Sequence, residues 1–164
     1  MISFFMHFNN KITKKKGNQR KITNIYNEGG KIVMKEDFIV VGKFDCSKYC
    51  LDFKCNTTDV ILTKNRFFHI VENHPEVSKY FKKIKMILKN PDEIYIENHK
   101  VNTLWIVKEI EDNIKITLKL NTIEDINKDY KHSIIQMQML DKQRIKKYMK
   151  NSRISKVFAK EKVL

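Results

Sequence analysis

The sequence contains few cysteines, little arginine and no long apolar segment. No apolar run approaches the roughly 18 residues that span a bilayer as a helix, so we expect no membrane partner. The three cysteines, Cys46, Cys50 and Cys55, are odd in number and lie close together, whereas a secreted disulfide scaffold uses an even set spread along the chain. The opening run from Ile2 to Phe8 is too short for a signal peptide. We therefore expect reduced cysteines and a cytoplasmic protein of a bacterial cell, encoded by the host or by a phage.

Motifs for metals and nucleotides are also missing. A zinc site that used the cysteines would need a second ligand cluster at a recognisable spacing, and the sequence has none. It has no phosphate-binding loop and no catalytic-triad signature. The expected site therefore has no metal and no cofactor.

The charge is strongly positive. Thirty-three lysines and arginines against 19 acidic residues give a net charge of +14. Such a charge favours a polyanionic partner, usually nucleic acid or an anionic membrane. The arginines, however, are only Arg20, Arg66, Arg144 and Arg153, and codon usage in an AT-rich genome also produces abundant lysine, asparagine and isoleucine. Nucleic-acid binding and codon bias both remain open explanations.

Residues 1–33 differ from the rest. They carry seven basic residues against one acid, Glu28, and show no sustained helical or strand periodicity. One interpretation is a flexible basic extension that adds phosphate contacts. The other is a translated leader with Met34 as the native start, because codons for Glu28-Gly29-Gly30 can spell a bacterial ribosome-binding sequence. Residues 34–164 would then form the single domain, with a net charge of +8.

Apolar patterning predicts the early elements. Residues 38–44 form an expected strand, in which Gly42 marks a bulge or a close approach. A second strand covers 59–63, and Thr63 is a suitable cap for a helix over 64–73 that His74-Pro75 ends. A second helix is expected from about 76 to 88.

The second half predicts a meander. Strands are expected to begin near 94, over 104–110 and over 114–120, where apolar residues alternate with Lys115, Thr117 and Lys119. That alternation is typical of a strand with one wet, basic face. A central strand over 132–137, a helix over about 140–150 and a short strand or tail over 154–158 complete an α+β pattern.

The first cluster of candidate residues lies on the helix over 64–73. Phe67, Ile70, Val71 and His74 share the stripe that should pack on the sheet. His69 lies off this stripe and aligns with Arg66 and Asn73, as at the edge of a cleft. The alternatives are a solvated surface position for His69 and a semi-buried helix-end position for His74.

The second cluster is Lys131, His132, Ser133 and Gln136. Alternation places Lys131 and Ser133 on one face of the strand, and His132 and Gln136 on the other. Lys108, Lys115 and Lys119 on neighbouring strands would extend a basic floor. For each lysine, a solvated surface role is the alternative.

These residue types suit metal-free cleavage of RNA. The RNA 2′-hydroxyl is an internal nucleophile next to the scissile phosphorus. The protein must supply a base near neutral pKa, cations against the phosphorane charge and an acid for the 5′ oxygen. Histidine suits the base or the acid, lysine or arginine the charge, and serine the orientation of the phosphate.

At these residues the chain resembles the phage-type barnase–EndoU–colicin–RelE-like (PBECR) nuclease domains. The resemblance covers roughly residues 38–158. Its pieces are Val41-Gly42-Lys43, Val60-Ile61-Leu62-Thr63, His69-Ile70, His74-Pro75, Pro91-Asp92-Glu93-Ile94, the hairpin with Lys119, and Ser133-Ile134-Ile135. It implies two N-terminal helices packed on a twisted antiparallel sheet of about four to five strands, with a C-terminal helix. It also implies His69, His74 and Ser133 as active-site residues, and members often carry threonine where this chain has Gln136.

The sequence therefore predicts a metal-independent endoribonuclease, an effector or toxin of a phage or mobile element. His69 would be the general base or acid, His74 a second acid or positioning group, and Ser133 would orient the phosphate. The expected substrate-binding residues are Arg66, Lys108, Lys119, Lys131, His132 and Gln136. RNA is the expected partner, with a protein inhibitor or antitoxin as a further one. The alternatives are a non-catalytic nucleic-acid-binding module and a protein–protein module of a phage or toxin–antitoxin pair.

Overall fold

The computed structural model describes residues 25–28, 31–34 and 36–161 of the chain. Strands β1 (Ile25–Glu28) and β2 (Lys31–Met34) pair as a short antiparallel hairpin. The expectation of a basic extension or translated leader over residues 1–33 lies mainly outside the described residues.

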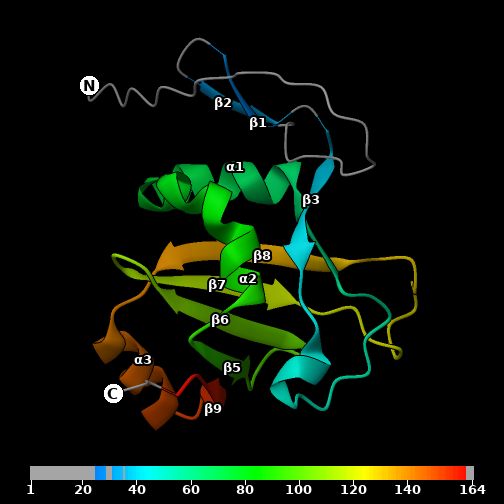
Figure 1. The fold of residues 1–164 in the computed structure, drawn as a ribbon, viewed down its shortest axis with the longest axis vertical. Helices are drawn as coiled ribbons and strands as arrows, with labels where there is room; N and C mark the ends of the chain where they lie inside the picture. The colour runs from blue at the N-terminus through cyan, green and yellow to red at the C-terminus, as the bar shows by residue number, and fades with distance from the viewer. Residues whose placement is uncertain (1–24, 29–30, 35, 162–164) are drawn as a thin grey trace.

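The main structure is one seven-stranded sheet (Figure 1). Its strands, in spatial order, are β3 (Phe38–Lys43), β4 (Asp59–Thr63), β8 (His132–Met139), β7 (Asn113–Lys119), β6 (Thr103–Glu109), β5 (Glu93–Glu97) and β9 (Ile154–Ala159). Neighbouring strands are antiparallel except β4 and β8, which run parallel.

The predicted fold class is therefore wrong in two respects. The sheet is mixed and has seven strands, not four to five in an antiparallel arrangement. Two strands, β3 and β4, also precede the helices that pack on the sheet, so those helices do not begin the domain. Local patterns find each strand, but the pairing of Val60 with His132 joins segments far apart in the chain and leaves no local signal.

Helices cover one face of the sheet. Helix α1 (Lys64–Asn73) begins at Thr63, whose hydroxyl accepts a hydrogen bond from the Arg66 amide, and ends before Pro75, as predicted. The expected second helix is instead a 3₁₀ segment, η2 (Pro75–Lys83), followed by a short α2 (Ile84–Lys89). Phe67 and Ile70 of α1 are fully buried in the main core between these segments and the sheet.

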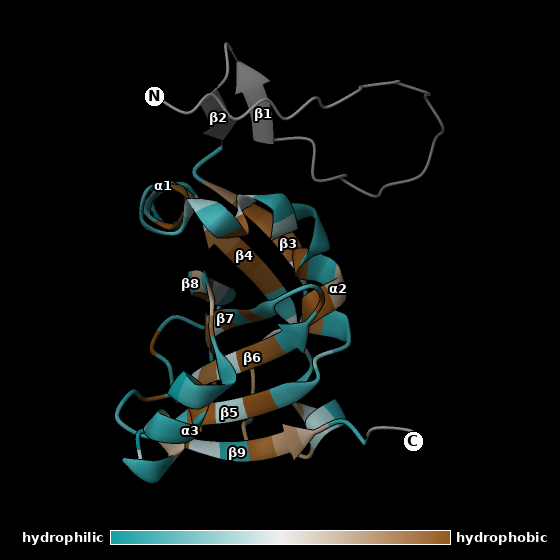
Figure 2. Ribbon diagram, turned by 90° about the vertical axis from the view of Figure 1, so that its left-hand side faces the viewer, coloured by the Kyte–Doolittle hydropathy of each residue, from teal (hydrophilic) through white to brown (hydrophobic). Residues whose placement is uncertain are grey.

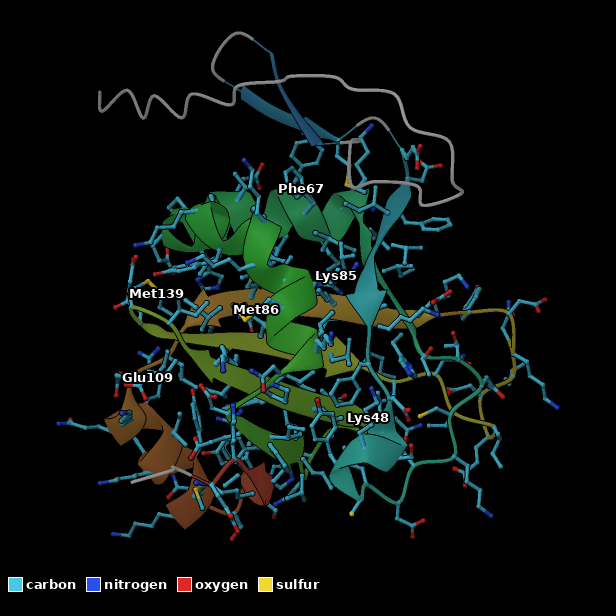
Figure 3. All side chains as sticks on the ribbon, in the orientation of Figure 1. Lys48, Phe67, Lys85, Met86, Glu109 and Met139 are labelled. Atoms are coloured by element: carbon cyan, nitrogen blue, oxygen red, sulfur yellow. The ribbon has the colours of Figure 1, made fainter. Side chains whose placement is uncertain are left out.

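Gly42 lies where β3 passes closest to α2. The ladder between β3 and β4 shifts register between Val40 and Gly42, which confirms the predicted bulge. A Cβ built on Gly42 would stand 3.0 Å from Leu88 Cδ1 and 3.4 Å from Lys85 Cα. Figure 3 shows Lys85 on α2 beside β3. The absence of a side chain therefore lets the helix approach the strand.

The opposite face of the sheet carries a smaller core under α3 (Lys142–Lys150), which Asp141 caps through the Arg144 amide. Figure 2 shows α2 and α3 on opposite sides of the sheet. The second core consists of Tyr95, Trp105, Val107, Leu140, Ile145 and Ile154. These residues come largely from β5, β6 and β9, so α3 covers that end of this face. Over the described ranges, no helix is long and apolar enough to cross a membrane. A short 3₁₀ turn, η1 (Cys46–Tyr49), lies in the connection between β3 and β4.

Candidate active site

The candidate site lies on the face that carries α3, between α3 and α1 (Figure 2). Cross-strand pairing places Trp105, Thr117 and Gln136 side by side on β6, β7 and β8. A parallel row contains Lys119 and Ser133, which also pair directly. Side chains alternate along a strand, so both rows point away from the main core. Polar groups from three strands therefore converge on one surface.

A chain of contacts links helix α1 to this surface. Gln136 Nε2 lies 3.4 Å from His74 Nε2, and Lys115 Nζ donates to Gln136 Oε1 at 3.2 Å. The other ring nitrogen, His74 Nδ1, lies 3.6 Å from Glu76 Oε1. The ladder between β4 and β8 covers only His132 and Ser133 on β8, so α1 lies beside the rest of that edge and its last residues reach Gln136.

These contacts favour one tautomer of a neutral His74 ring. Because Gln136 Oε1 accepts from Lys115, the amide NH₂ of Gln136 faces His74 and can donate to an unprotonated Nε2. A neutral imidazole with Nε2 as acceptor carries its proton on Nδ1, which faces the Glu76 carboxylate. In that tautomer the Nε2 lone pair of His74 points at the sheet surface, as a general base requires.

Lys115 is a buried amine behind Gln136. Only 3% of the residue is exposed, and its Nζ lies 4.0 Å from the centre of the Trp105 ring. Burial lowers the pKa of Lys115 to about 8, against the opposing effect of the Glu97 carboxylate. Glu97 accepts a 2.8 Å hydrogen bond from the Trp105 indole, which holds the ring under the amine. Lys115, which was expected on a solvent-exposed face of β7, is therefore buried instead.

Hydroxyl groups complete the surface. Thr117 is almost fully buried, and its Oγ1 has no hydrogen-bond partner among the described residues. Ser133 is half-buried, and no hydrogen bond involves its hydroxyl within residues 36–161. Lys119, next to Ser133, donates to the Val101 carbonyl at 2.6 Å. Thr117 thus lies directly across from Gln136, and Ser133 and Lys119 lie in a separate row of the same face.

His69 and Arg66 lie elsewhere. Both are exposed on α1, and the hydrogen bonds of His69 go to Asn73 on the same helix: Asn73 Nδ2 lies 3.3 Å from His69 Nδ1 and donates to its carbonyl at 2.8 Å. The predicted Arg66–His69–Asn73 ridge exists, but in the described part of the chain no side-chain contact joins it to Ser133 or Gln136. The structure brings His74, and not His69, to the sheet residues.

His132 faces the opposite side, into the main core. It is fully buried, and its Nδ1 accepts a 3.0 Å hydrogen bond from the Asn121 amide. Burial lowers the pKa of His132 to about 4, so the ring is neutral near pH 7. Gln136 was expected on the same face as His132, but Ile135 is inserted at a bulge in the ladder, and this moves Gln136 to the outer face.

The remaining predicted lysines form ion pairs. Lys131 lies 3.0 Å from Asp59, which also pairs with Lys43 at 3.0 Å. By alternation Lys131 shares the face of Ser133, at one end of the surface. Lys108 pairs with Asp92 at 2.6 Å, and its cross-strand partner Ile114 belongs to the main core, so Lys108 lies on the face opposite the candidate site.

Comparison with known proteins gives one family. The model of the phage-Barnase-EndoU-ColicinE5/D-RelE like nuclease 2 family (PBECR2) matches residues 52–156. The chain belongs to this family. No curated protein and no solved structure matches it.

The match bears directly on the site. Residues 52–156 include α1, β7 and β8, so His74, Lys115, Gln136 and Ser133 all fall within the PBECR2 match. The family name indicates a nuclease of the barnase, EndoU, colicin or RelE type, with nucleic acid as substrate. Across the described residues, no group of three or more His, Cys, Asp or Glu side chains is placed to hold a metal ion.

Several residues of the site were missed at the sequence level. Lys115 was expected only as part of a basic floor, Thr117 only as a position on the wet face of its strand, and Glu76 had no expected role in the site. The alternation of Lys115, Thr117 and Lys119 within an apolar strand was the available signal. It was read as a solvated face because no local pattern shows that α3 and Trp105 cover part of it.

Proposed function

We propose that this PBECR2 protein is a metal-independent endoribonuclease that cleaves RNA at the surface around His74, Gln136 and Ser133. The observation that carries the proposal is the contact chain Glu76–His74–Gln136–Lys115, which directs an imidazole lone pair at a surface with hydroxyl and ammonium donors. A role as phage or mobile-element effector belongs to the same proposal.

In the proposed reaction His74 is the general base. Its Nε2 takes the proton of the RNA 2′-hydroxyl, and the 2′ oxygen attacks the adjacent phosphorus. The bond from phosphorus to the 5′ oxygen breaks, which leaves a 2′,3′-cyclic phosphate and a 5′-hydroxyl. Lys119 donates the proton that the leaving oxygen takes up. The Ser133 hydroxyl donates to a non-bridging phosphate oxygen and orients it.

Gln136 and Lys115 act as positioning residues. The Lys115–Gln136 hydrogen bond keeps the amide turned with its NH₂ toward His74, and this selects the tautomer that can accept a proton. The Gln136 NH₂ must release His74 Nε2 when the 2′-hydroxyl binds, and the buried Thr117 hydroxyl lies beside Gln136 as a new partner. Family members often carry threonine where this chain has Gln136, so this amide would replace a hydroxyl.

Lys131 and Lys43 would bind a phosphate at one end of the surface. Arg66 would bind another phosphate at the exposed ridge of α1. His69 takes the role of a flanking group in this proposal, because its contacts stay within α1. His132 takes a structural role, because it is buried on the other face.

The test is incubation of the purified protein with an RNA and with a DNA of the same sequence, both in EDTA. We expect cleavage of RNA alone, with 2′,3′-cyclic phosphate ends. Cleavage of both the RNA and the DNA, or products with 5′-phosphate ends, would contradict the proposed use of the 2′-hydroxyl. Binding of RNA without any cleavage would favour the non-catalytic binding module.

A further inference from the structure

Three apolar side chains extend the proposed site across β4 and β3. Ladder pairing continues the Lys119–Ser133 row to Ile61 on β4 and from there to Val40 on β3. Phe38 lies two residues before Val40 on the same side of β3. The row thus begins at the Lys119 ammonium, continues with the Ser133 hydroxyl and ends in apolar side chains.

The apolar end is open. Phe38 is 48% exposed and Val40 45% exposed, whereas Ile39 between them is buried in the main core. Ile61, next to Ser133, is half-buried. An edge strand usually carries polar residues on its solvent side, so two adjacent exposed apolar residues on β3 need a reason.

Charge beside the patch points to a strand of nucleic acid. Asp59, Lys43 and Lys131 lie on the same face, one step along the strands from Ile61 and Ser133. Two ammonium groups against one carboxylate leave this end positive. A surface that alternates apolar side chains and cations is what a single strand binds, through stacked bases and phosphates respectively.

We propose that Phe38, Val40 and Ile61 form a binding site for one nucleobase of the substrate strand, next to the phosphate held by Ser133 and Lys119. The proposal rests on the proposed function for the position of that phosphate. Neighbouring strands lie about 4.8 Å apart, so Ile61 is about one strand and Val40 about two strands from Ser133. The sugar and base of the nucleotide at Ser133 would cover that span, with the Phe38 ring against the base.

The site is non-specific in its recognition. The three side chains of the site, phenylalanine, valine and isoleucine, offer contact area and an aromatic face but no hydrogen-bonding group. Every base has a stackable face, so we expect binding to depend on the presence of a base and only weakly on its identity.

The experiment measures binding of a fluorescent, non-cleavable 2′-O-methyl RNA oligonucleotide to the full chain. Phe38→Ala should weaken binding by between about fivefold and a hundredfold, since stacking of one base on an aromatic ring contributes that much. Phe38→Tyr should restore most of the affinity. Replacement of Val40, 45% exposed on β3, by Ala should weaken binding, whereas Val157→Ala, at 37% exposure on the opposite edge strand β9, should not.

An oligonucleotide in which single positions are abasic completes the test. With the wild-type protein, removal of the base at one position should weaken binding. With Phe38→Ala, removal of the base at that same position should cause no further loss of affinity. Equal binding by wild type and Phe38→Ala would overturn the proposal. So would a wild-type dimer that Phe38→Ala dissociates, because the patch would then join two copies of the chain.

The two proposals fail separately. If the wild type cleaves RNA but Phe38→Ala binds and cleaves as the wild type does, the base site is wrong and the proposed function stands. If the wild type binds with the expected Phe38 and abasic dependence but leaves RNA intact, the base site stands and the proposed function is wrong.

Discussion

Replacement of Lys115 by Met should stabilise the protein while it impairs cleavage. Methionine keeps an unbranched side chain against Trp105 and removes the buried charge. The fall of the Lys115 pKa from 10.5 to about 8 corresponds to about 3 kcal/mol of lost stability for the charged form. Loss of the hydrogen bond to Gln136 costs about 1 kcal/mol. The net expectation is a gain of about 2 kcal/mol at pH 7.

The effect must depend on pH in a defined direction. Between pH 8 and pH 10.5 the unfolded chain keeps the Lys115 proton and the folded chain has released it, so the wild type gains stability as the pH rises. Lys115→Met has no such group, and its advantage should shrink to nothing across this window. Catalysis should fall, because Gln136 loses the contact that orients it toward His74.

Urea unfolding at pH 7 and pH 10, followed by the fluorescence of the single Trp105, measures the first effect, and RNA cleavage measures the second. Lys48→Met is the matched control, since Lys48 is exposed on η1 and its loss should change stability by less than about 0.5 kcal/mol. A Lys115→Met variant that is less stable than the wild type at pH 7, or that cleaves RNA at the full rate, would refute the reasoning.

Three further outcomes concern His132, Gly42 and Gln136. Burial lowers the pKa of His132 from 6.5 to about 4, so the unfolded chain takes up a proton first on acidification and the wild type should lose up to about 3 kcal/mol between pH 6.5 and pH 4. A His132→Gln variant should lack this part of the dependence of stability on pH. Equal urea midpoints for both proteins across this pH range would contradict the lowered pKa of His132. Gly42→Ala should cost about 1–2 kcal/mol in thermal unfolding, because its Cβ would press on Leu88 and α2; an unchanged or higher Tm counts against the close approach. Gln136→Leu should lower the cleavage rate by about tenfold to a hundredfold and should cost about 1 kcal/mol of stability through the lost hydrogen bond from Lys115, and full activity would mean that Gln136 does not position His74.

Local structure was largely predictable from the sequence. The helix over 64–73, its Thr63 cap and the Gly42 bulge are present as expected, because each depends on residues close together in the chain. The second helix was only half right. Its first part winds as a 3₁₀ segment after Pro75, and the apolar stripe of the sequence does not separate the two helix types.

Long-range structure was not predictable in the same way. Each of the seven strands left a local apolar run, yet the parallel pairing of β4 with β8 depends on residues 72 positions apart, so the sheet was expected to be smaller and antiparallel. The site depends on the same kind of information. A single inserted residue in β8 decides that Gln136, and not His132, reaches the outer face.

Burial explains the other difference. In the sequence Lys115 looks like one of many surface lysines, and only the packing of Trp105 and α3 makes it a buried amine of low pKa. His69 and His74 are equally plausible as bases by residue type. The orientation of α1 against the edge of β8 distinguishes them, because it directs His74 inward and leaves His69 in solvent.

The most direct measurement of the central claim compares His74→Ala with His69→Ala for cleavage of one RNA in EDTA. Removal of a general base should slow His74→Ala by about 10²-fold to 10⁴-fold, while RNA binding and unfolding stay close to those of the wild type. His69→Ala should cleave within a few-fold of the wild type. The reverse order, with His69 essential and His74 dispensable, would contradict a site built on the His74–Gln136 contact.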